Sequence, residues 1–127
     1  MRFELGTAPA PGEIARAVLL MTVDADGSPR VAVLSSSEIA APDDRRLRIE
    51  LRADSATCAN ARARDKAAVW YVLDGAAYTV KGSVSAPRDG AKQGHTAFEQ
   101  TVESVWMDFE AGAPMAGGPT YRAPARD

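Results

Sequence analysis

Residues 18–34 read VLLMTVDADGSPRVAVL, and this stretch holds two strand signals joined by a turn. It begins with a nearly continuous apolar run, which is typical of a strand that is buried on both faces. Asp24-Ala25-Asp26-Gly27 has the composition of a tight turn, and Pro29 delays the start of the next strand to Arg30. We therefore expect consecutive strands at 18–23 and 30–37.

Three more strand signals and one helix signal follow. Residues 46–52 alternate strictly, so that Leu47, Ile49 and Leu51 share one face of a strand and charged residues share the other. Residues 67–73 and 77–85 flank Asp74-Gly75, a two-residue hairpin signal. Residues 55–64 are rich in alanine and arginine and begin at capping candidates, Asp54 and Ser55, which predicts a short helix.

The C-terminal part of the chain has a different pattern. Thr96-Ala97-Phe98-Glu99 matches a helix capping box, and apolar side chains then recur at helical spacing as far as Phe109. We therefore expect an amphipathic helix at 95–111, followed by a tail at 112–127 in which 120–122 is a candidate edge strand. Residues 13–16, at the end of a lead-in at 1–16, are expected to form a short helical turn.

Composition narrows the class of protein. The chain has 127 residues, 46% of them hydrophobic and 25% charged, as in one soluble globular domain. A net charge of -2 argues against a nucleic-acid partner. The single cysteine, Cys58, rules out an internal disulfide, and with His95 as the sole histidine we expect no metal site. Because we find neither a signal-peptide core nor an apolar run of membrane-spanning length, we expect a cytoplasmic protein without a membrane partner.

The order and spacing of these pieces resemble the flavin-binding split β-barrel family, which includes the pyridoxamine 5'-phosphate oxidases and their small relatives. The matching pieces are an apolar strand closing on Asp26-Gly27-Ser28-Pro29, then Arg30 to Leu34, Ser55-Ala56-Thr57 at a helix start, and the strands at 66–72 and 78–84. The likeness covers about residues 17–86 and implies a mainly β fold. That fold is an antiparallel, Greek-key-like split barrel with a short helix after the third strand.

The resemblance also implies a cofactor site. In that family the domain is usually a homodimer, and the flavin lies at the subunit interface. Arg30 falls where the family often has an arginine that contacts the flavin phosphate, and Ser55 and Thr57 fall where it carries a hydroxyl and a basic residue for the same group. Thr57 stands where lysine or arginine is common, and Ser35 where the oxidases have a lysine. These two departures remove positive charge from this expected phosphate-binding site, the phosphate seat.

The residues themselves favour an anion at the same place. A helix N-terminus presents unpaired N–H groups and a partial positive charge, so it stabilises a phosphate. Ser55 and Thr57 add neutral donors, and Arg30 or Arg52 adds a charge-assisted contact. Two interpretations of Ser55 stay open, because serine also caps helices routinely. An arginine such as Arg30 is, taken alone, typical of a solvated strand end.

Two other residues have simpler interpretations. Cys58 lies in the alanine-rich predicted helix, where we expect it to be a small buried filler. Trp70 is expected to pack in the core.

The resemblance implies a flavin-dependent oxidoreductase that binds FMN or the deazaflavin F420 and acts on an unknown small molecule. No catalytic side chain need be visible, because the cofactor carries the redox chemistry. Two alternatives stay open: a non-catalytic protein that binds a flavin or haem, and a dimeric relative without a cofactor. Pyridoxamine phosphate oxidase activity itself is not assigned, because residues 120–127 offer no counterpart of the long C-terminal strand that bears the substrate residues in those enzymes.

Overall fold

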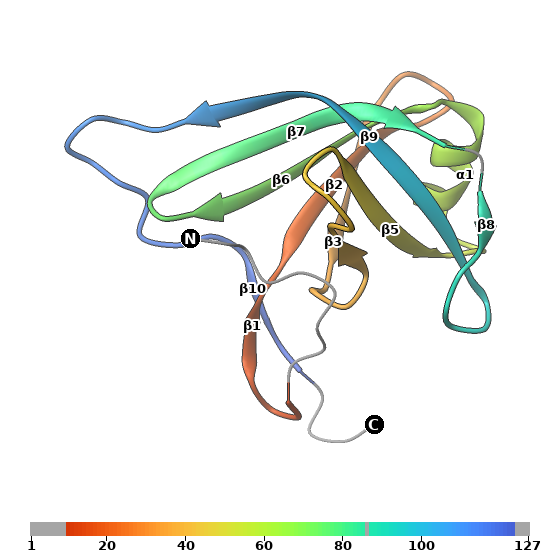
Figure 1. Cartoon of the computed structure of the whole chain (residues 1–127), viewed down its shortest axis with the longest axis horizontal. Helices are drawn as coiled ribbons and strands as arrows, with labels where there is room; N and C mark the ends of the chain where they lie inside the picture. The colour runs from red at the N-terminus through yellow and green to blue at the C-terminus, as the bar shows by residue number, and fades with distance from the viewer. Residues whose placement is uncertain (1–9, 86, 124–127) are drawn as a thin grey trace.

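The computed structural model describes residues 10–85 and 87–123, which form an antiparallel β structure with one short helix (Figure 1). The elements in chain order are β1 (Ile14–Arg16), β2 (Val18–Val23), β3 (Pro29–Leu34), β4 (Ile39–Ala40), β5 (Arg46–Arg52), α1 (Ala56–Ala63), β6 (Lys66–Leu73), β7 (Ala76–Val84), β8 (Arg88–Asp89), β9 (His95–Asp108) and β10 (Thr120–Arg122). The five strands and the helix predicted between residues 18 and 85 are all present, close to their predicted boundaries. The predicted mainly β fold class is confirmed.

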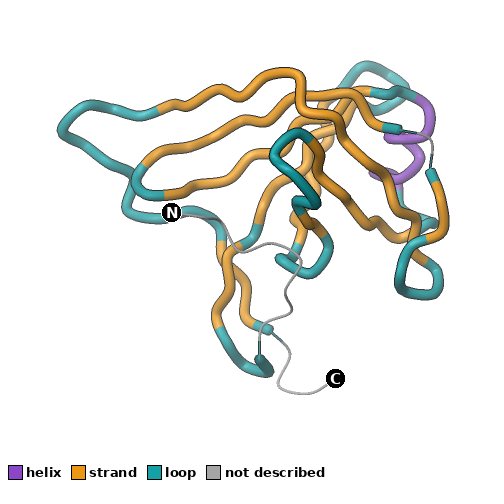
Figure 2. Tube along the Cα trace, in the orientation of Figure 1, coloured by secondary structure: helices purple, strands orange, loops and turns teal. Residues whose placement is uncertain are grey.

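One curled sheet contains eight of the strands, in the order β3-β2-β6-β7-β9-β5-β4, with β8 paired to β9. Every pairing in it is antiparallel. Strand β9 joins the two halves of this sheet, since it pairs with β7 on one side and with β5 on the other. Helix α1 lies at one end of the curled sheet, where it contacts β2, β3 and β5 (Figure 2).

The core fills the concave side of the sheet. Its fully buried members come from every long strand and from α1, and include Leu20, Ile49, Cys58, Val69 and Phe98. Cys58 has no exposed surface, so the prediction of a buried filler is confirmed. Because side chains alternate between the two faces of a strand, the residues between these core positions face outward.

The prediction of an amphipathic helix at 95–111 is wrong, because residues 95–108 form the long strand β9. The pairing with β7 shifts register between Lys81 and Gly82, so that Glu103 is an extra residue on β9. The shift lengthens one step of the alternation. Phe98 and Val102, which contact the core, are two ordinary steps apart, whereas the shift places Val105, beside the hollow, three residues after Val102. The resulting spacing of four and three residues is also the spacing of a helix stripe, which explains the error.

The two ends of the described chain pair with each other. The prediction of a helical turn at 13–16 is wrong, because residues 14–16 form strand β1. The candidate edge strand at 120–122 is confirmed as β10. The two strands form a separate antiparallel ribbon in which Ile14 faces Arg122. A backbone ladder thus replaces the helical turn, because the tail supplies a partner that local sequence does not reveal.

The outer side of the sheet is unusually apolar. The strand registers place Val33, Leu19, Trp70, Thr79 and Trp106 in one row across five strands. In this chain Val33 and Trp106 are each 63% exposed. Trp70 is partly exposed in the same row, so the prediction that it packs in the core is wrong. The reason is alternation: Val69, its neighbour, is the buried residue.

Candidate functional site

The N-terminus of α1 is built by Ser55, the residue that caps the helix. Its hydroxyl accepts a hydrogen bond from the Cys58 amide at 3.0 Å and donates one to the Arg52 carbonyl at 2.8 Å. The capping interpretation of Ser55 is therefore confirmed, and its single proton is already used. The first turn carries no acidic side chain, so the partial positive charge of the helix end is not offset there.

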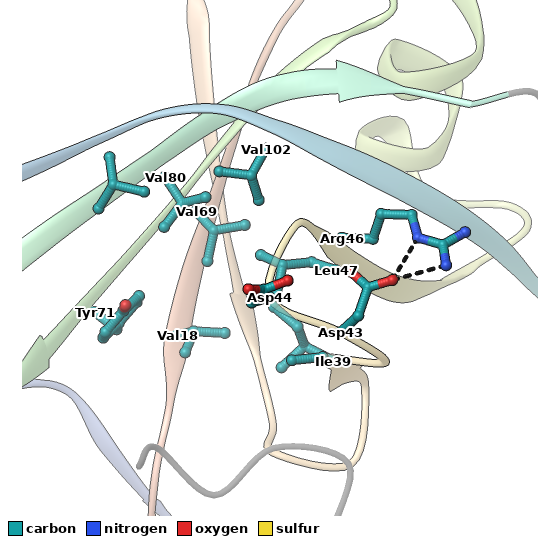
Figure 3. Close-up of a pocket in the computed structure, with 12 residues that line it drawn as sticks. Val18, Ile39, Asp43, Asp44, Arg46, Leu47, Val69, Tyr71, Val80 and Val102 are labelled. Atoms are coloured by element: carbon teal, nitrogen blue, oxygen red, sulfur yellow. Dashed lines mark hydrogen bonds and ion pairs between the residues drawn. The ribbon is translucent and has the colours of Figure 1, made fainter. Parts of the chain in front are cut away.

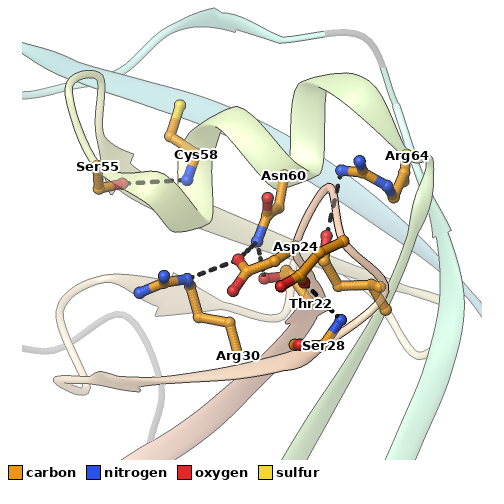
Figure 4. Close-up of polar contacts among 10 residues, drawn as sticks. Thr22, Asp24, Ser28, Arg30, Ser55, Cys58, Asn60 and Arg64 are labelled. Atoms are coloured by element: carbon orange, nitrogen blue, oxygen red, sulfur yellow. Dashed lines mark hydrogen bonds and ion pairs between the residues drawn. The ribbon is translucent and has the colours of Figure 1, made fainter.

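Arg30 lies beside the same helix but is joined to it through Asp24. The Arg30 Nε donates to Asp24 Oδ1 at 2.7 Å, and the Asn60 amide nitrogen donates to the same oxygen at 2.7 Å (Figure 4). Asn60 also donates to the Thr22 hydroxyl at 3.1 Å. The Arg30 guanidinium, followed by the Asn60 amide, holds the pKa of the Asp24 carboxyl below its ordinary value.

Four of the five predicted site residues cluster near α1, and Ser35 does not. Arg52, Ser55 and Thr57 lie together at the start of α1, whereas Arg30 is joined to the helix one turn later, through Asp24, which accepts from Asn60. Thr57 is only 7% exposed, so its side chain belongs to the interior. Ser35 lies beyond the far end of β3, roughly 16 Å along an extended chain from Arg30. Its hydroxyl donates to Glu38 at 3.0 Å, in a turn that is not part of this cluster.

The charges of the cluster are balanced. Arg30 pairs with Asp24, and the exposed Arg52 pairs with Asp54 at 3.1 Å. A phosphate group needs unpaired donors and preferably an unpaired cation. The helix end supplies the donors, whereas each of the two predicted cations already has a carboxylate. The start of α1 therefore offers an anion suitable donors but no unpaired cation. Arg30 would be free to bind an anion only if its contact with Asp24 were broken.

A depression on the outer side of the sheet lies next to the start of β3. It measures about 400 Å³, which is within the range of small-molecule sites. Met21, Val23, Pro29 and Ala68 give it an apolar lining, and two lysines, Lys66 and Lys81, flank it. Lys66 pairs with Glu103 at 3.2 Å, whereas Lys81 is exposed and has no ion-pair partner among the described residues.

A second hollow of about 260 Å³ opens on the concave side (Figure 3). Valine side chains from β2, β6, β7 and β9 line it, and Asp43, Asp44 and Arg46 stand at one side. The Arg46 Nη2 bonds Asp43 at 2.7 Å, which leaves Asp44 as the acidic group without a salt bridge among the described residues. This hollow shares none of its lining residues with the Arg30 cluster, so it is a separate feature.

Asp24 and Asn60 are the members of the cluster that sequence reasoning missed. Asp24 was interpreted only as part of a turn, and it is indeed in one, since the Gly27 amide donates to the Asp24 carbonyl at 2.9 Å. The sequence could have pointed to Asn60, because asparagine is unfavourable inside a helix unless its side-chain amide has a hydrogen-bond partner. It is 7% exposed.

Comparison with known proteins identifies the fold. No protein-family model matches this sequence, and no curated protein matches it. Among solved structures, HupZ from Group A Streptococcus is 18% identical, with a TM-score of 0.63 over 80% of this chain and 90% of that one. An F420 reductase is 16% identical, with a TM-score of 0.59 over 72% and 89%. A candidate pyridoxamine 5'-phosphate oxidase from Lactobacillus delbrueckii is 20% identical, with a TM-score of 0.60 over 72% and 84%.

In the part of the chain that the structure describes, none of the helices has the length and hydrophobicity needed to cross a bilayer. The similarity in backbone structure extends over 84–90% of the length of these solved structures. The chain therefore has the split β-barrel fold of the pyridoxamine 5'-phosphate oxidase-like proteins, which is the fold that its sequence resemblance implied.

Proposed function

We propose that this chain forms a homodimer that binds a flavin-type cofactor, FMN or the deazaflavin F420, and uses it in a redox reaction on a small molecule. Similarly folded proteins include an F420 reductase and candidate pyridoxamine 5'-phosphate oxidases, which supports the cofactor class. The observation that carries the proposal is the outer depression. It combines an apolar floor, Lys81, which has no ion-pair partner among the described residues, and Pro29 at the start of β3, whose neighbour Arg30 faces α1 on the other side of the sheet.

The apolar outer face supports the dimer. Val31, Val33 and Trp106 are each more than half exposed and lie in neighbouring rows of one sheet. A monomeric protein rarely leaves such side chains uncovered side by side. A second copy of the chain on this face would bury them and would also cover the depression. Two copies related by a twofold axis would present the same patch to each other.

Each residue of the site has a role in this proposal. Met21 and Ala68 offer a flat apolar surface to a planar ring, and Lys81 offers a positive charge near its edge. The N-terminus of α1 offers backbone donors to a phosphate group, with Arg30 beside it. The bound cofactor supplies the electron or hydride transfer. The chain binds it, orients it and keeps water from its reactive face.

The test begins with the absorbance of freshly isolated protein and a fluorescence titration with FMN. We expect FMN to bind, and Lys81→Met to weaken binding by about tenfold, as for loss of one charge-assisted contact. The matched control is Lys92→Met, because Lys92 is also exposed but lies in the β8–β9 loop. A wild-type protein that leaves FMN fluorescence unchanged at millimolar concentration, with F420 equally inert, would contradict the proposal.

A second candidate is a dimer of this fold without a cofactor. The balanced Arg30–Asp24 and Arg52–Asp54 pairs favour it, because they leave little net attraction for a phosphate. The same titration separates the two candidates, since this one forms the dimer but binds neither FMN nor F420. A non-catalytic carrier of a flavin or haem would instead show a bound chromophore without turnover of any acceptor.

A further inference from the structure

The side chain of Asp24 stands between Arg30 and Asn60 of helix α1. We propose that the Asp24 carboxylate is a built-in competitor for the phosphate seat and determines how strongly Arg30 binds a phosphate group. The inference rests on the proposed function only where the phosphate belongs to a flavin; the competition itself concerns this chain alone.

The geometry puts one oxygen at the centre of the contact. Asp24 Oδ1 accepts from Arg30 Nε and from the Asn60 amide, each at 2.7 Å (Figure 4). Both are short bonds, as expected for charge-assisted or carboxylate acceptors. A phosphate oxygen that bound Arg30 and the helix side together would need the place that this oxygen holds.

The helix side of the contact is buried and hydrogen-bonded. Asn60 is 7% exposed and Thr22 is 3% exposed, and the Asn60 amide bonds both Thr22 and Asp24. Arg64, at the end of α1, donates to the Val23 carbonyl at 3.2 Å and anchors the same β2–β3 turn. Asp24 is therefore held in place by a buried amide rather than by the exposed arginine alone.

Removing the carboxylate leaves the rest of the seat intact. Arg30 would keep its place on β3, with its side chain 44% exposed, and would gain a free positive charge beside α1. The neighbouring Asp26 offers a matched control, because it lies in the same turn with the same charge but accepts from the Ser28 amide at 2.9 Å. Asp24→Asn and Asp26→Asn change the net charge equally.

The experiment titrates inorganic phosphate into the full chain and follows the Arg30 Nε–H resonance by NMR. We expect Asp24→Asn to reach half-saturation at a phosphate concentration about tenfold lower than the wild type. Asp26→Asn should stay within about twofold of the wild type. Asp24→Ser is the second variant, because its hydroxyl still offers Asn60 an acceptor if the asparagine variant does not fold.

A parallel titration uses FMN and riboflavin, which differ by the phosphate. Asp24→Asn should gain about tenfold for FMN and remain unchanged for riboflavin, and Arg30→Gln added to it should abolish the gain. Equal phosphate affinity in the wild type and in the folded Asp24 variants would overturn the inference. A gain for phosphate with no binding of FMN or F420 would support the role of Asp24 and would reject the flavin-binding proposal instead.

Discussion

Leu19 and Leu20 are neighbours on β2, yet they belong to two different surfaces. Leu20 is 1% exposed and packs in the core, whereas Leu19 lies in the outer row with Val33 and Trp70. An antiparallel sheet with one solvated face normally alternates apolar and polar residues. Here both faces of β2 are apolar. The inner face stabilises the fold, and the outer face has no such use in a single subunit.

The difference shows that the two faces of one strand can serve two purposes, folding on the buried face and assembly on the exposed face. The buried residues of β2 specify which way the sheet curls, because they must meet Val69, Ile49 and Phe98. The exposed residues of β2 and β3 are not needed for that. Their apolar character is explained if a second subunit covers them, so the two leucines provide a direct way to separate folding from assembly.

The largest effect is expected for Leu20→Ala. It should lower the free energy of unfolding by about 2–5 kcal/mol, because it removes a fully buried side chain and leaves a cavity. Leu19→Ala, on the other face, should cost about 1 kcal/mol in dilute protein, where the subunits are apart. Urea denaturation at several protein concentrations measures both. If both variants lose the same free energy of unfolding at every protein concentration, the two faces of β2 do not differ as described.

A second effect is expected at the register shift of β9. Gly82 has no room for a side chain, because a Cβ there would overlap the Thr101 carbonyl oxygen. Gly82→Ala should therefore cost about 2–3 kcal/mol, as overpacking forces the backbone to move. Gly117→Ala is the matched control, since nothing lies within 4 Å of its Cβ position. Thermal unfolding of both variants checks the prediction, and an unchanged midpoint for Gly82→Ala would contradict it.

The outer face is tested by Val33→Glu, which buries a charge at the proposed interface. We expect the dissociation constant of the dimer to rise by about a hundredfold, because a twofold interface receives the change twice. Ala59→Glu is the control, because Ala59 is exposed on α1 rather than on this face. Sedimentation velocity measures the assembly. A wild-type chain that stays monomeric at high concentration would leave the apolar outer face without this explanation.

The smallest effect concerns pH. The Arg30 guanidinium lowers the pKa of Asp24 in the folded chain, so its stabilising effect is present above the ordinary carboxyl pKa of about 3.9. That effect is lost as the pH falls through the lower folded value. The stability difference between the wild type and Asp24→Asn should therefore be constant near neutral pH and shrink below about pH 4.

Urea unfolding from pH 7 to pH 3 measures this difference. Asp44→Asn is the control variant, because it removes the same charge from a residue that has no salt bridge among the described residues. A constant difference between the wild type and Asp24→Asn across the whole range would show that the Asp24–Arg30 contact adds no stability.

Local pattern predicted the fold between residues 18 and 85 and the edge strand at 120–122, but failed at 13–16 and at 95–111, for physical reasons. The strands between residues 18 and 85 are short, and turn residues such as Gly27 and Gly75 mark their ends. Strand β9 instead carries a register shift at Glu103 that only its pairing with β7 creates. Its first half is buried on both faces, so alternation is invisible there. Two neighbours in the sheet, rather than its own residues, determine its structure.

The candidate site was predicted in part for a similar reason. The helix cap at Ser55 is local, and its residues stand close together in the chain. The contact of Asp24 with Asn60 joins residues 36 positions apart, which no motif encodes. Ser35 was proposed from a family position, and it lies in a turn at the other end of β3. Charge balance is a property of neighbours in space, so it appears only with the structure.

The position of β9 between β5 and β7 has a consequence for how the chain reaches its native state. Until residues 95–108 arrive, β7 lacks a neighbour on that side and β5 pairs only with the two residues of β4. During synthesis on the ribosome, the chain therefore carries two open strand edges, which readily join other chains. Chaperones that cover such edges would raise the yield of this protein most in that interval.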